Sequence, residues 1–161
     1  MCSTKKPFVL ALCTLALLLC SLFSSAFAVK VEQTTAQLVN NSSDVIRGKV
    51  TGVVSKWDEP HTMIFTEVTI NVSEIVLGSI EKGRTITIYV PGGVVGDTGL
   101  KVEHAAKFEK GEEVVVFLTQ LQGMYGVTSW EMGKFTVQNG NLREKNQPVA
   151  EFINEIKKFK K

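Results

Sequence analysis

The sequence predicts a mainly β protein, a small closed or partly open Greek-key β-barrel with a short N-terminal helix and a C-terminal amphipathic helix. Three observations indicate this fold. Several segments alternate apolar and polar residues with the period of a strand. Turns rich in Gly, Asn and Asp separate them, and the C-terminal segment has apolar residues at helical spacing.

The segment Met63–Gly78 has the longest alternation in the chain, too long for a simple hairpin and suited to a curved sheet. Its first half is predicted to place one set of side chains on the core face: Ile64, Thr66, Val68, Ile70 and Val72. The alternation then slips, so that Ile75 and Leu77 fall on the opposite face. A bulge near Ser73–Glu74 would return both residues to the core.

The first 28 residues are typical of a secretory signal peptide. Lys5 and Lys6 provide a positive start, residues 8–23 are almost entirely apolar, and Ala26-Phe27-Ala28 supplies the small residues of a cleavage site. We therefore expect cleavage after Ala28 and a secreted or extracytoplasmic protein. The alternative is that the leader is kept as a membrane anchor, because the apolar run is just long enough to span a bilayer.

The cysteines and charges limit what the mature chain, residues 29–161, can do. Cys2, Cys13 and Cys20 all lie in the leader, so the mature chain has no disulfide, no thiol nucleophile and no thiolate metal site. It is long enough to fold as a single domain on its core alone. Two of the 18 basic residues lie in the leader, which leaves 16 against 16 acidic residues and argues against a nucleic-acid partner.

Gln33–Asn41 is predicted to form the short N-terminal helix, with Leu38 and Val39 facing inward, and the polar run that follows it is typical of a turn. Val45–Trp57 is predicted as the first strand. Its core face is expected to hold Ile46, Val50 and Val54 together with Gly48 and Gly52. Glycines at such positions suit a strand that is bent into a barrel wall.

Further strands are expected at Arg84–Val90, Val114–Leu121, Tyr125–Trp130 and Phe135–Gln138, with Asn139-Gly140-Asn141 turning the last of these into Leu142-Arg143. Pro91–Lys110 is predicted to be irregular, with a glycine-rich first half and with Leu100–Phe108 as a short helix or strand. A loop of this length in a small domain is usually functional or mobile.

The C-terminal helix is predicted over residues 148–160. Pro148 favours a first helical turn, and Glu151 and the late lysines complement the helix dipole. Its apolar stripe is Val149, Phe152, Ile153, Ile156 and Phe159.

Three segments, Ser43–Val50, Thr69–Gly78 and Phe108–Leu118, resemble a bacterial and archaeal family of small exported proteins. They are also distantly similar to the netrin-like domain of tissue inhibitors of metalloproteinases. The resemblance implies an OB-like Greek-key barrel with terminal helices. Those inhibitors chelate the protease zinc through a mature N-terminal cysteine, whereas the expected N-terminus here is Val29. The barrel disulfides are also missing, so the resemblance carries over no functional residue.

Neither histidine lies in a recognised metal or catalytic motif. His61 and His104 have acidic neighbours at spacings that match no known site, and we interpret both as surface-loop residues. The sequence also has no nucleophile elbow and no phosphate-binding motif. We therefore expect no enzymatic activity, no catalytic residues, no cofactor and no metal site.

Aromatic and glycine residues are the best candidates for ligand contact. The candidate residues are Trp57, Tyr89, Gly92, Gly93 and Tyr125, with Trp130 and Phe135 as further aromatics. Exposed aromatics on an OB-like barrel can stack on bases or sugars. The preferred interpretation is that they fill the barrel ends, because large aromatics dominate small cores.

The expected function is an exported binding module, acting as a monomer, for an extracellular protein or a cell-wall polymer. Contacts are expected from the loop at Pro91–Lys107 and the rim near Trp57. One alternative is a modulator or inhibitor of a secreted metalloprotease that works without cysteine chelation. A second alternative is a hydrolase with an unrecognised site. A membrane is expected as a partner only if the leader is retained.

Overall fold

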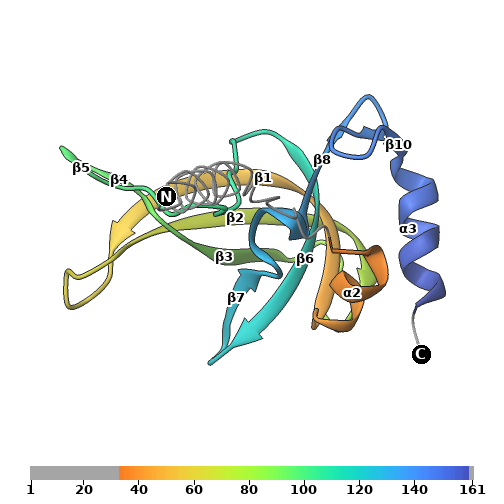
Figure 1. Ribbon diagram of the computed structural model, residues 1–161, viewed down its shortest axis with the longest axis horizontal. Helices are drawn as coiled ribbons and strands as arrows, with labels where there is room; N and C mark the ends of the chain where they lie inside the picture. Colours follow the sequence, from red (N-terminus) through yellow and green to blue (C-terminus); the bar gives the residue numbers. More distant parts are fainter. Residues whose placement is uncertain (1–32, 160–161) are drawn as a thin grey trace, which may run out of the picture. The chain divides into compact units, whose positions relative to one another are not determined.

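The computed structural model describes residues 33–159 (Figure 1). The predicted signal peptide, its cleavage site after Ala28, the three cysteines and residue 160 of the predicted C-terminal helix lie outside the described residues. The described part is mainly β, with a short helix before the first strand and a helix after the last. This coarse prediction of the fold is confirmed. Between residues 33 and 159, no helix is both long and apolar enough to cross a membrane.

The elements follow the predicted order, with three short strands in addition. They are α2 (Thr35–Asn40), β1 (Asp44–Trp57), β2 (Ile64–Leu77), β3 (Thr85–Pro91), β4 (Gly93–Val95), β5 (Thr98–Leu100), β6 (Glu113–Leu121), β7 (Met124–Val127), the 3-10 helix η1 (Trp130–Gly133), β8 (Lys134–Gln138), β9 (Asn141–Leu142), β10 (Gln147–Pro148) and α3 (Val149–Lys158). The stretch after β3 is therefore not wholly irregular, because β4 and β5 form a hairpin within it.

In the described part, eight strands form one mixed sheet in the order β1-β2-β3-β7-β6-β8-β9-β10, and β6 also pairs with β1. β1 pairs with β2 from Val45 to Trp57. Its first residues, Asp44–Lys49, pair on their other edge with β6. β3 and β7 are joined by a single parallel residue pair, Ile88 and Tyr125.

The buried apolar side chains form two clusters rather than the one interior expected of a simple barrel. The sheet-side cluster lies between β1, β2, β3 and β6 and consists of Ile46, Val50, Val68, Ile70, Val72, Ile80, Ile86, Ile88, Val90, Val114, Val116 and Leu118. The helix-side cluster lies under α2 and α3 and consists of Leu38, Val39, Val45, Val76, Val115, Phe117, Phe135, Val137, Leu142, Val149, Phe152, Ile153 and Ile156.

β6 separates the two clusters and is buried on both faces. Its residues Val114–Leu118 have no exposed surface, and alternate side chains enter alternate clusters. On the helix side, Phe117, Phe135 and Phe152 pack with ring centroids 4.9 to 6.1 Å apart. Aromatic contacts at these separations add to the free energy of burial. Phe135 therefore belongs to the core.

The predicted core face of β1 is wrong beyond Val50. The pairing with β2 shifts register between Val50 and Gly52. This irregularity adds a residue to β1 and reverses the faces that follow. Val54 is consequently 53% exposed, and Val53 packs against the sheet-side cluster in its place.

The bulge predicted in β2 is present, because the register with β1 skips Ser73. Ile75 returns to the sheet-side cluster as expected. A second irregularity follows at Val76, and Leu77 packs against the helix-side cluster. The two faces of β2 therefore serve different clusters at its C-terminal end.

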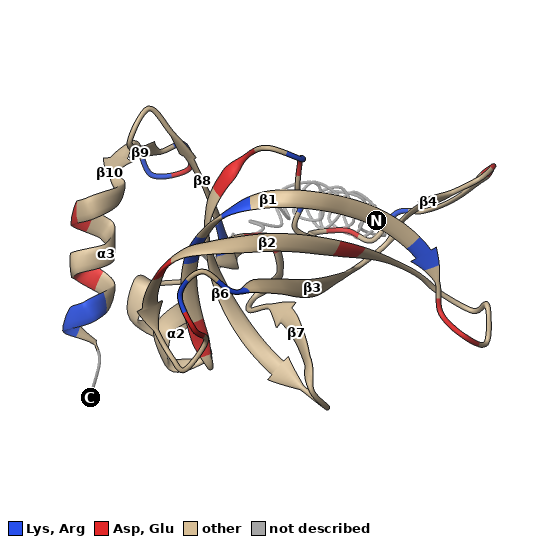
Figure 2. Cartoon of the chain, turned by 180° about the vertical axis from the view of Figure 1, so that it is seen from behind, with Lys and Arg blue, Asp and Glu red and all other residues tan. Residues whose placement is uncertain are grey.

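Both helices cover the helix-side cluster. Within residues 33–159 they lie at the opposite end from the β4–β5 hairpin (Figure 1). α2 begins with a capping box in which Thr34 and Gln37 each accept a hydrogen bond from the other's backbone N–H. α3 buries four of the five predicted stripe residues, but Phe159, beyond its end, is 39% exposed. Figure 2 shows lysines at the last turn of α3, where they complement the helix dipole.

The turn after β2 depends on a buried carboxylate. Asp44 is 3% exposed, and its Oδ1 accepts hydrogen bonds from the backbone N–H groups of Ser79 (2.8 Å) and Ile80 (3.3 Å). Gly78 has φ +101°, and a Cβ at this position would overlap Asp44 Oδ1. The close approach therefore requires glycine.

We predict that Gly78→Ala destabilises the protein much more than Gly83→Ala. Both glycines have positive φ, but a Cβ at Gly83 would meet nothing within 4 Å. Gly83→Ala should cost about 1 to 2 kcal/mol from backbone strain alone. Gly78→Ala should cost at least twice as much, because it also displaces a buried acceptor. Urea unfolding of both variants measures the difference, and equal midpoints would contradict the role of Asp44.

Candidate binding cleft

An apolar cleft of about 710 Å³ opens between the sheet and the segment that follows β3. Its lining is Val53, Ser55, Thr66, Val68, Val90, Pro91, Gly92, Gly93, Val94, Gly99, Leu100, Lys101, Val102, Ala105, Ala106, Lys107, Phe108 and Glu109. This volume is typical of sites for small molecules or peptide side chains. The segment predicted to make contacts, Pro91–Lys107, supplies most of the lining.

The floor of the cleft is the part of β1, β2 and β3 that faces the sheet-side cluster. It combines aliphatic side chains with one polar pair, Ser55 and Thr66, whose hydroxyl oxygens lie 3.0 Å apart. The Thr66 hydroxyl donates to the carbonyl oxygen of Gly92 at 2.7 Å. This bond ties the chain that leaves β3 to the floor.

Gly92 and Gly93 allow the backbone to cross directly over the floor. Their φ angles are +95° and +138°. A Cβ on Gly93 would overlap the hydroxyls of Ser55 and Thr66, and one on Gly92 would lie 2.8 Å from the carbonyl oxygen of Leu100. Both positions therefore need glycine for a close approach, and both line the cleft.

The β4–β5 hairpin forms one wall of the cleft and projects away from the sheet (Figure 1). Val95 pairs with Thr98 around the two-residue turn Gly96-Asp97. Val94 is 67% exposed although it also lines the cleft. The hairpin thus presents an apolar side chain at the mouth.

Residues 102–109 form another part of the wall. Beyond Leu100 the chain has neither helix nor strand until β6, so the short helix or strand expected at Leu100–Phe108 is found only as the last residue of β5. Phe108 packs against the sheet-side cluster and lines the cleft. Ala105 also packs against this cluster and lines the cleft, so this wall is apolar.

A buried ion pair holds this wall in place. Lys134 Nζ lies 2.8 Å from Glu112 Oε1, with only 9% of the lysine and 13% of the glutamate side chain exposed. The same ammonium donates to the carbonyl oxygen of Lys107. It also lies 4.7 Å from the centroid of the Phe108 ring, where a cation is attracted to the aromatic face. Lys134 was not singled out in the sequence, because the predicted strand begins at Phe135 and lysine side chains are normally solvated.

The charged groups of the cleft lie at its rim. Lys101, Lys107 and Glu109 line the cleft and are exposed. Neither lysine forms an ion pair with another residue of the described part. The rim therefore has a small excess of positive charge over an apolar interior.

The candidate aromatic residues lie outside the cleft. Trp57 stacks on His61 in the β1–β2 loop, with ring centroids 5.9 Å apart. Tyr89 lies on the face of β3 opposite its buried residues. Tyr125 packs against the sheet-side cluster and lines a separate hollow. Trp130, in η1, is 50% exposed.

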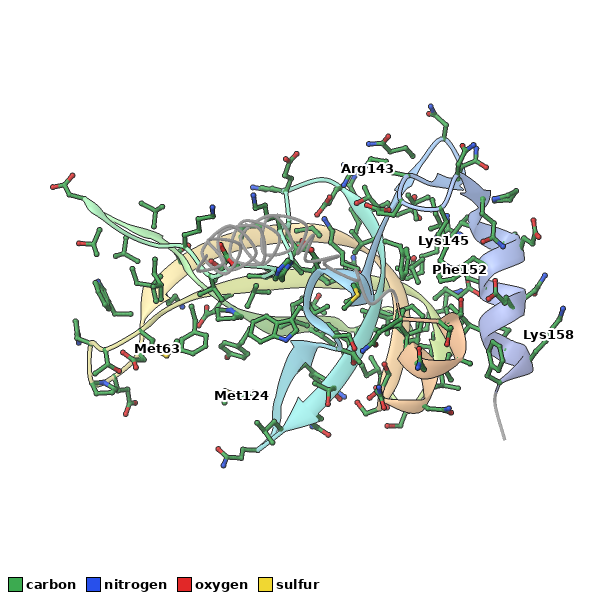
Figure 3. The ribbon with its side chains drawn as sticks, viewed as in Figure 1. Met63, Met124, Arg143, Lys145, Phe152 and Lys158 are labelled. Atoms are coloured by element: carbon green, nitrogen blue, oxygen red, sulfur yellow. The ribbon has the colours of Figure 1, made fainter. Side chains whose placement is uncertain are left out.

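Exposed apolar side chains also occur at the tips of the β1–β2 and β6–β7 hairpins. Met63 follows the β1–β2 loop and is 40% exposed, and Met124 begins β7 and is 48% exposed. Figure 3 shows both well away from α3, where Phe152 lies beside Lys145. The Lys145 Nζ is 5.0 Å from the centroid of that ring. Neither methionine lines the cleft.

Both histidines lie in surface turns with positive φ. The Nδ1 of His104 lies 3.0 Å from Glu131 Oε1. This hydrogen bond, together with the charge of the same carboxylate, raises the pKa of His104 above its usual value. Among residues 33–159, no group of three or more His, Cys, Asp or Glu side chains is placed to hold a metal ion.

Asp58 organises the loop that contains His61. Its Oδ1 accepts from the backbone N–H groups of Thr62 (2.6 Å) and Met63 (3.0 Å), and its Oδ2 accepts from the Thr62 hydroxyl. The Met63 N–H and then the Thr62 hydroxyl hold the pKa of Asp58 below its usual value. The loop is therefore a structured turn rather than a loose rim.

No protein-family model matches the chain, and no curated protein sequence matches it significantly. The resemblance to netrin-like domains stays a prediction.

We predict that Lys134→Ala destabilises the protein by about 3 kcal/mol, because it leaves the Glu112 carboxylate buried without its partner. Urea unfolding measures the change. Lys56→Ala is the matched control, since its pair with Glu67 is exposed (57% of the lysine side chain) and should contribute below about 1 kcal/mol. The double variant Lys134→Met, Glu112→Gln should recover much of the lost stability. If Lys134→Ala and Lys56→Ala unfold at the same midpoint, the wall does not depend on this pair.

We predict that Glu131→Gln lowers the pKa of His104, because it removes the charge that stabilises the imidazolium. Since the pKa is raised in the folded state, the pair stabilises the fold fully below the unfolded-state pKa of about 6.5. That contribution is lost as the pH rises through the folded-state pKa. An NMR titration of the His104 ring measures the shift. Glu103→Gln should lower it less, because Glu103 acts only through its charge.

Proposed function

We propose that this protein is an exported, non-enzymatic binding module for an extracellular protein or a cell-wall polymer, and that the ligand occupies the cleft. The observation that carries the proposal is the cleft itself. About 710 Å³ of largely apolar space remains open beside the sheet-side cluster, whose residues Val68 and Val90 line it. Exposed apolar surface of this kind usually marks a binding site.

The construction of the walls supports the same conclusion. Two glycines and a hydroxyl pair hold the chain that leaves β3 close to the floor, and a buried ion pair fixes the wall at residues 102–109. A lysine and a glutamate buried at this position cost desolvation free energy that an apolar filling would avoid. The polar groups near the mouth are few and lie at the rim, which is typical of sites that orient a largely apolar ligand.

We further propose that the large sheet is a small barrel of OB-like type. The support is the order of pairings, which runs β1-β2-β3-β7-β6 and returns to β1, with an antiparallel β1–β6 contact and a parallel β3–β7 contact. A five-stranded Greek-key barrel has connections of this kind. In this proposal, β8, β9 and β10 extend the sheet beyond the ring.

An extracellular protein suits the cleft better than a polysaccharide does. Half of the lining residues are Val, Leu, Ala or Phe, whereas sugar sites rely on aromatic faces and dense polar contacts. The one stacked pair, Trp57 with His61, lies outside the cleft. A wall polymer would therefore bind at that pair, and a protein would bind in the cleft.

The test compares two probes on the purified protein: a phage-displayed library of random 12-residue peptides, and sedimentation with insoluble peptidoglycan. Ala105→Trp fills the cleft. Asn154→Trp adds the same side chain to the exposed side of α3 and serves as the matched control. We expect library peptides to bind the unmodified protein and Asn154→Trp, and to lose at least ten-fold in affinity with Ala105→Trp.

Two results would overturn the cleft as the binding site. One is binding that Ala105→Trp leaves unchanged while Trp57→Ala abolishes it, which would move the site to the β1–β2 loop. The other is a failure of both probes to bind. Circular dichroism and thermal unfolding of each variant show whether a loss of binding reflects a loss of fold.

A further inference from the structure

β1 is longer than β6, the strand on its second edge, and among residues 33–159 this leaves part of that edge unpaired. β6 pairs with β1 only over Asp44–Lys49. The residues just before β6 add two backbone hydrogen bonds to this edge. The N–H of Val50 donates to the carbonyl of Glu112 (2.9 Å), and the carbonyl of Val50 accepts from the N–H of Gly111 (2.8 Å). From residue 51 to 57, β1 pairs with β2 but with no other strand of the described part.

The register identifies which backbone groups face this edge. The N–H of Asp58 donates to the carbonyl of Met63. In an antiparallel pair, hydrogen-bonded residues alternate with residues whose N–H and C=O point away from the partner. Val54 and Lys56 therefore bond to β2, and the backbone groups of Val53, Ser55 and Trp57 face the open edge. The backbone bonds of Val50 also point away from β2, although Val50 has an even number. The register shift between Val50 and Gly52 adds one residue to β1, so the outward-facing positions change from even to odd numbers there.

The open edge and the cleft share residues. Val53 and Ser55, whose backbone groups face the edge, also line the cleft with their side chains. In an antiparallel pair, directly opposite residues place their side chains on the same face. A strand added to this edge would therefore direct every second side chain into the cleft.

We propose that the ligand is an extended segment of a partner protein that adds to β1 as an antiparallel strand beside residues 51–57. This inference rests on the proposed function and narrows it to one occupant. A row of N–H and C=O groups at strand spacing is complementary to a polypeptide backbone, and strand addition with alternate side chains in pockets is an established mode of peptide recognition. A polysaccharide has no such repeat.

Charge complementarity specifies the segment further. Two lysines, Lys101 and Lys107, and one glutamate, Glu109, stand at the rim of the apolar cleft. The segment should therefore alternate apolar residues over the cleft and carry an acidic residue at its flank. Such a charge increases the association rate and fixes the register more than it adds affinity.

The test uses peptides selected from the 12-residue library and resynthesised with one backbone nitrogen methylated at a time. We expect N-methylation to lower the affinity ten-fold or more at every second residue, and less than three-fold between them. The sensitive residues should be those whose truncation to alanine also lowers the affinity, because in antiparallel pairing the bonded residues face the cleft. The double variant Lys101→Gln, Lys107→Gln should bind peptides with an acidic flank more weakly than the unmodified protein does.

A protein-side variant gives an independent measurement. Val53→Pro removes an edge-facing N–H and no bond to β2, a replacement that edge strands tolerate. Val53→Ala keeps the N–H and is the matched control. We expect Val53→Pro to lower the affinity at least ten-fold relative to Val53→Ala. If Val53→Pro does not fold, the methylated peptides on the unmodified protein decide the question.

The outcomes separate this inference from the proposed function. Peptides that lose binding to Ala105→Trp but tolerate every N-methylation would occupy the cleft through side chains alone. That result overturns strand addition and leaves the binding module in place. A library that yields no binder sensitive to Ala105→Trp overturns the peptide-binding cleft itself.

Discussion

The pairing of β1 with β6 is the contact on which the rest of the structure depends. It joins six residue pairs, Asp44–Lys49 with Glu113–Leu118, and it brings two segments that lie far apart in the sequence to the centre of the protein. Every side chain of β6 from Val114 to Leu118 is fully buried, alternately in the sheet-side and the helix-side cluster. Without this pairing, neither cluster would have its central strand.

The same pairing explains why a cleft exists. After Val50 the two strands separate, and the chain before β6 turns away from β1. β1, β2 and β3 continue past the point where β6 leaves β1, and residues 92–109 cover this extension incompletely. The cleft and the open edge of β1 are two results of one mismatch in strand length.

Strand positions could be predicted from the sequence because alternation is a local signal. β1, β2, β3, β6 and β8 lie within one or two residues of their predicted ranges. The exposed position of Val54 could not be predicted from the sequence, because it depends on a register shift that only the pairing with β2 defines. The β4–β5 hairpin had a usable signal in Gly96-Asp97, a two-residue turn between residues that pair, but its strands are too short to show alternation.

Some residues of the candidate site could likewise be predicted from the sequence, and others could not. Gly92 and Gly93 were found because clustered glycines indicate unusual backbone geometry, and both contribute to the cleft. The ion pair of Lys134 with Glu112 was missed because its partners are 22 residues apart and each alone is typical of a solvated surface. The aromatic residues were chosen for their type, and type does not predict which hollow a side chain lines.

The β4–β5 hairpin is fastened to the sheet where Gly92 and Gly93 cross it, while the space around Gly96 at its tip is empty. Its end can accept inserted residues without disturbing either hydrophobic cluster, since loop tips of this kind tolerate insertion. The depth of the recess, and with it the choice of ligand, can therefore change in evolution or by engineering while the folding stability stays constant.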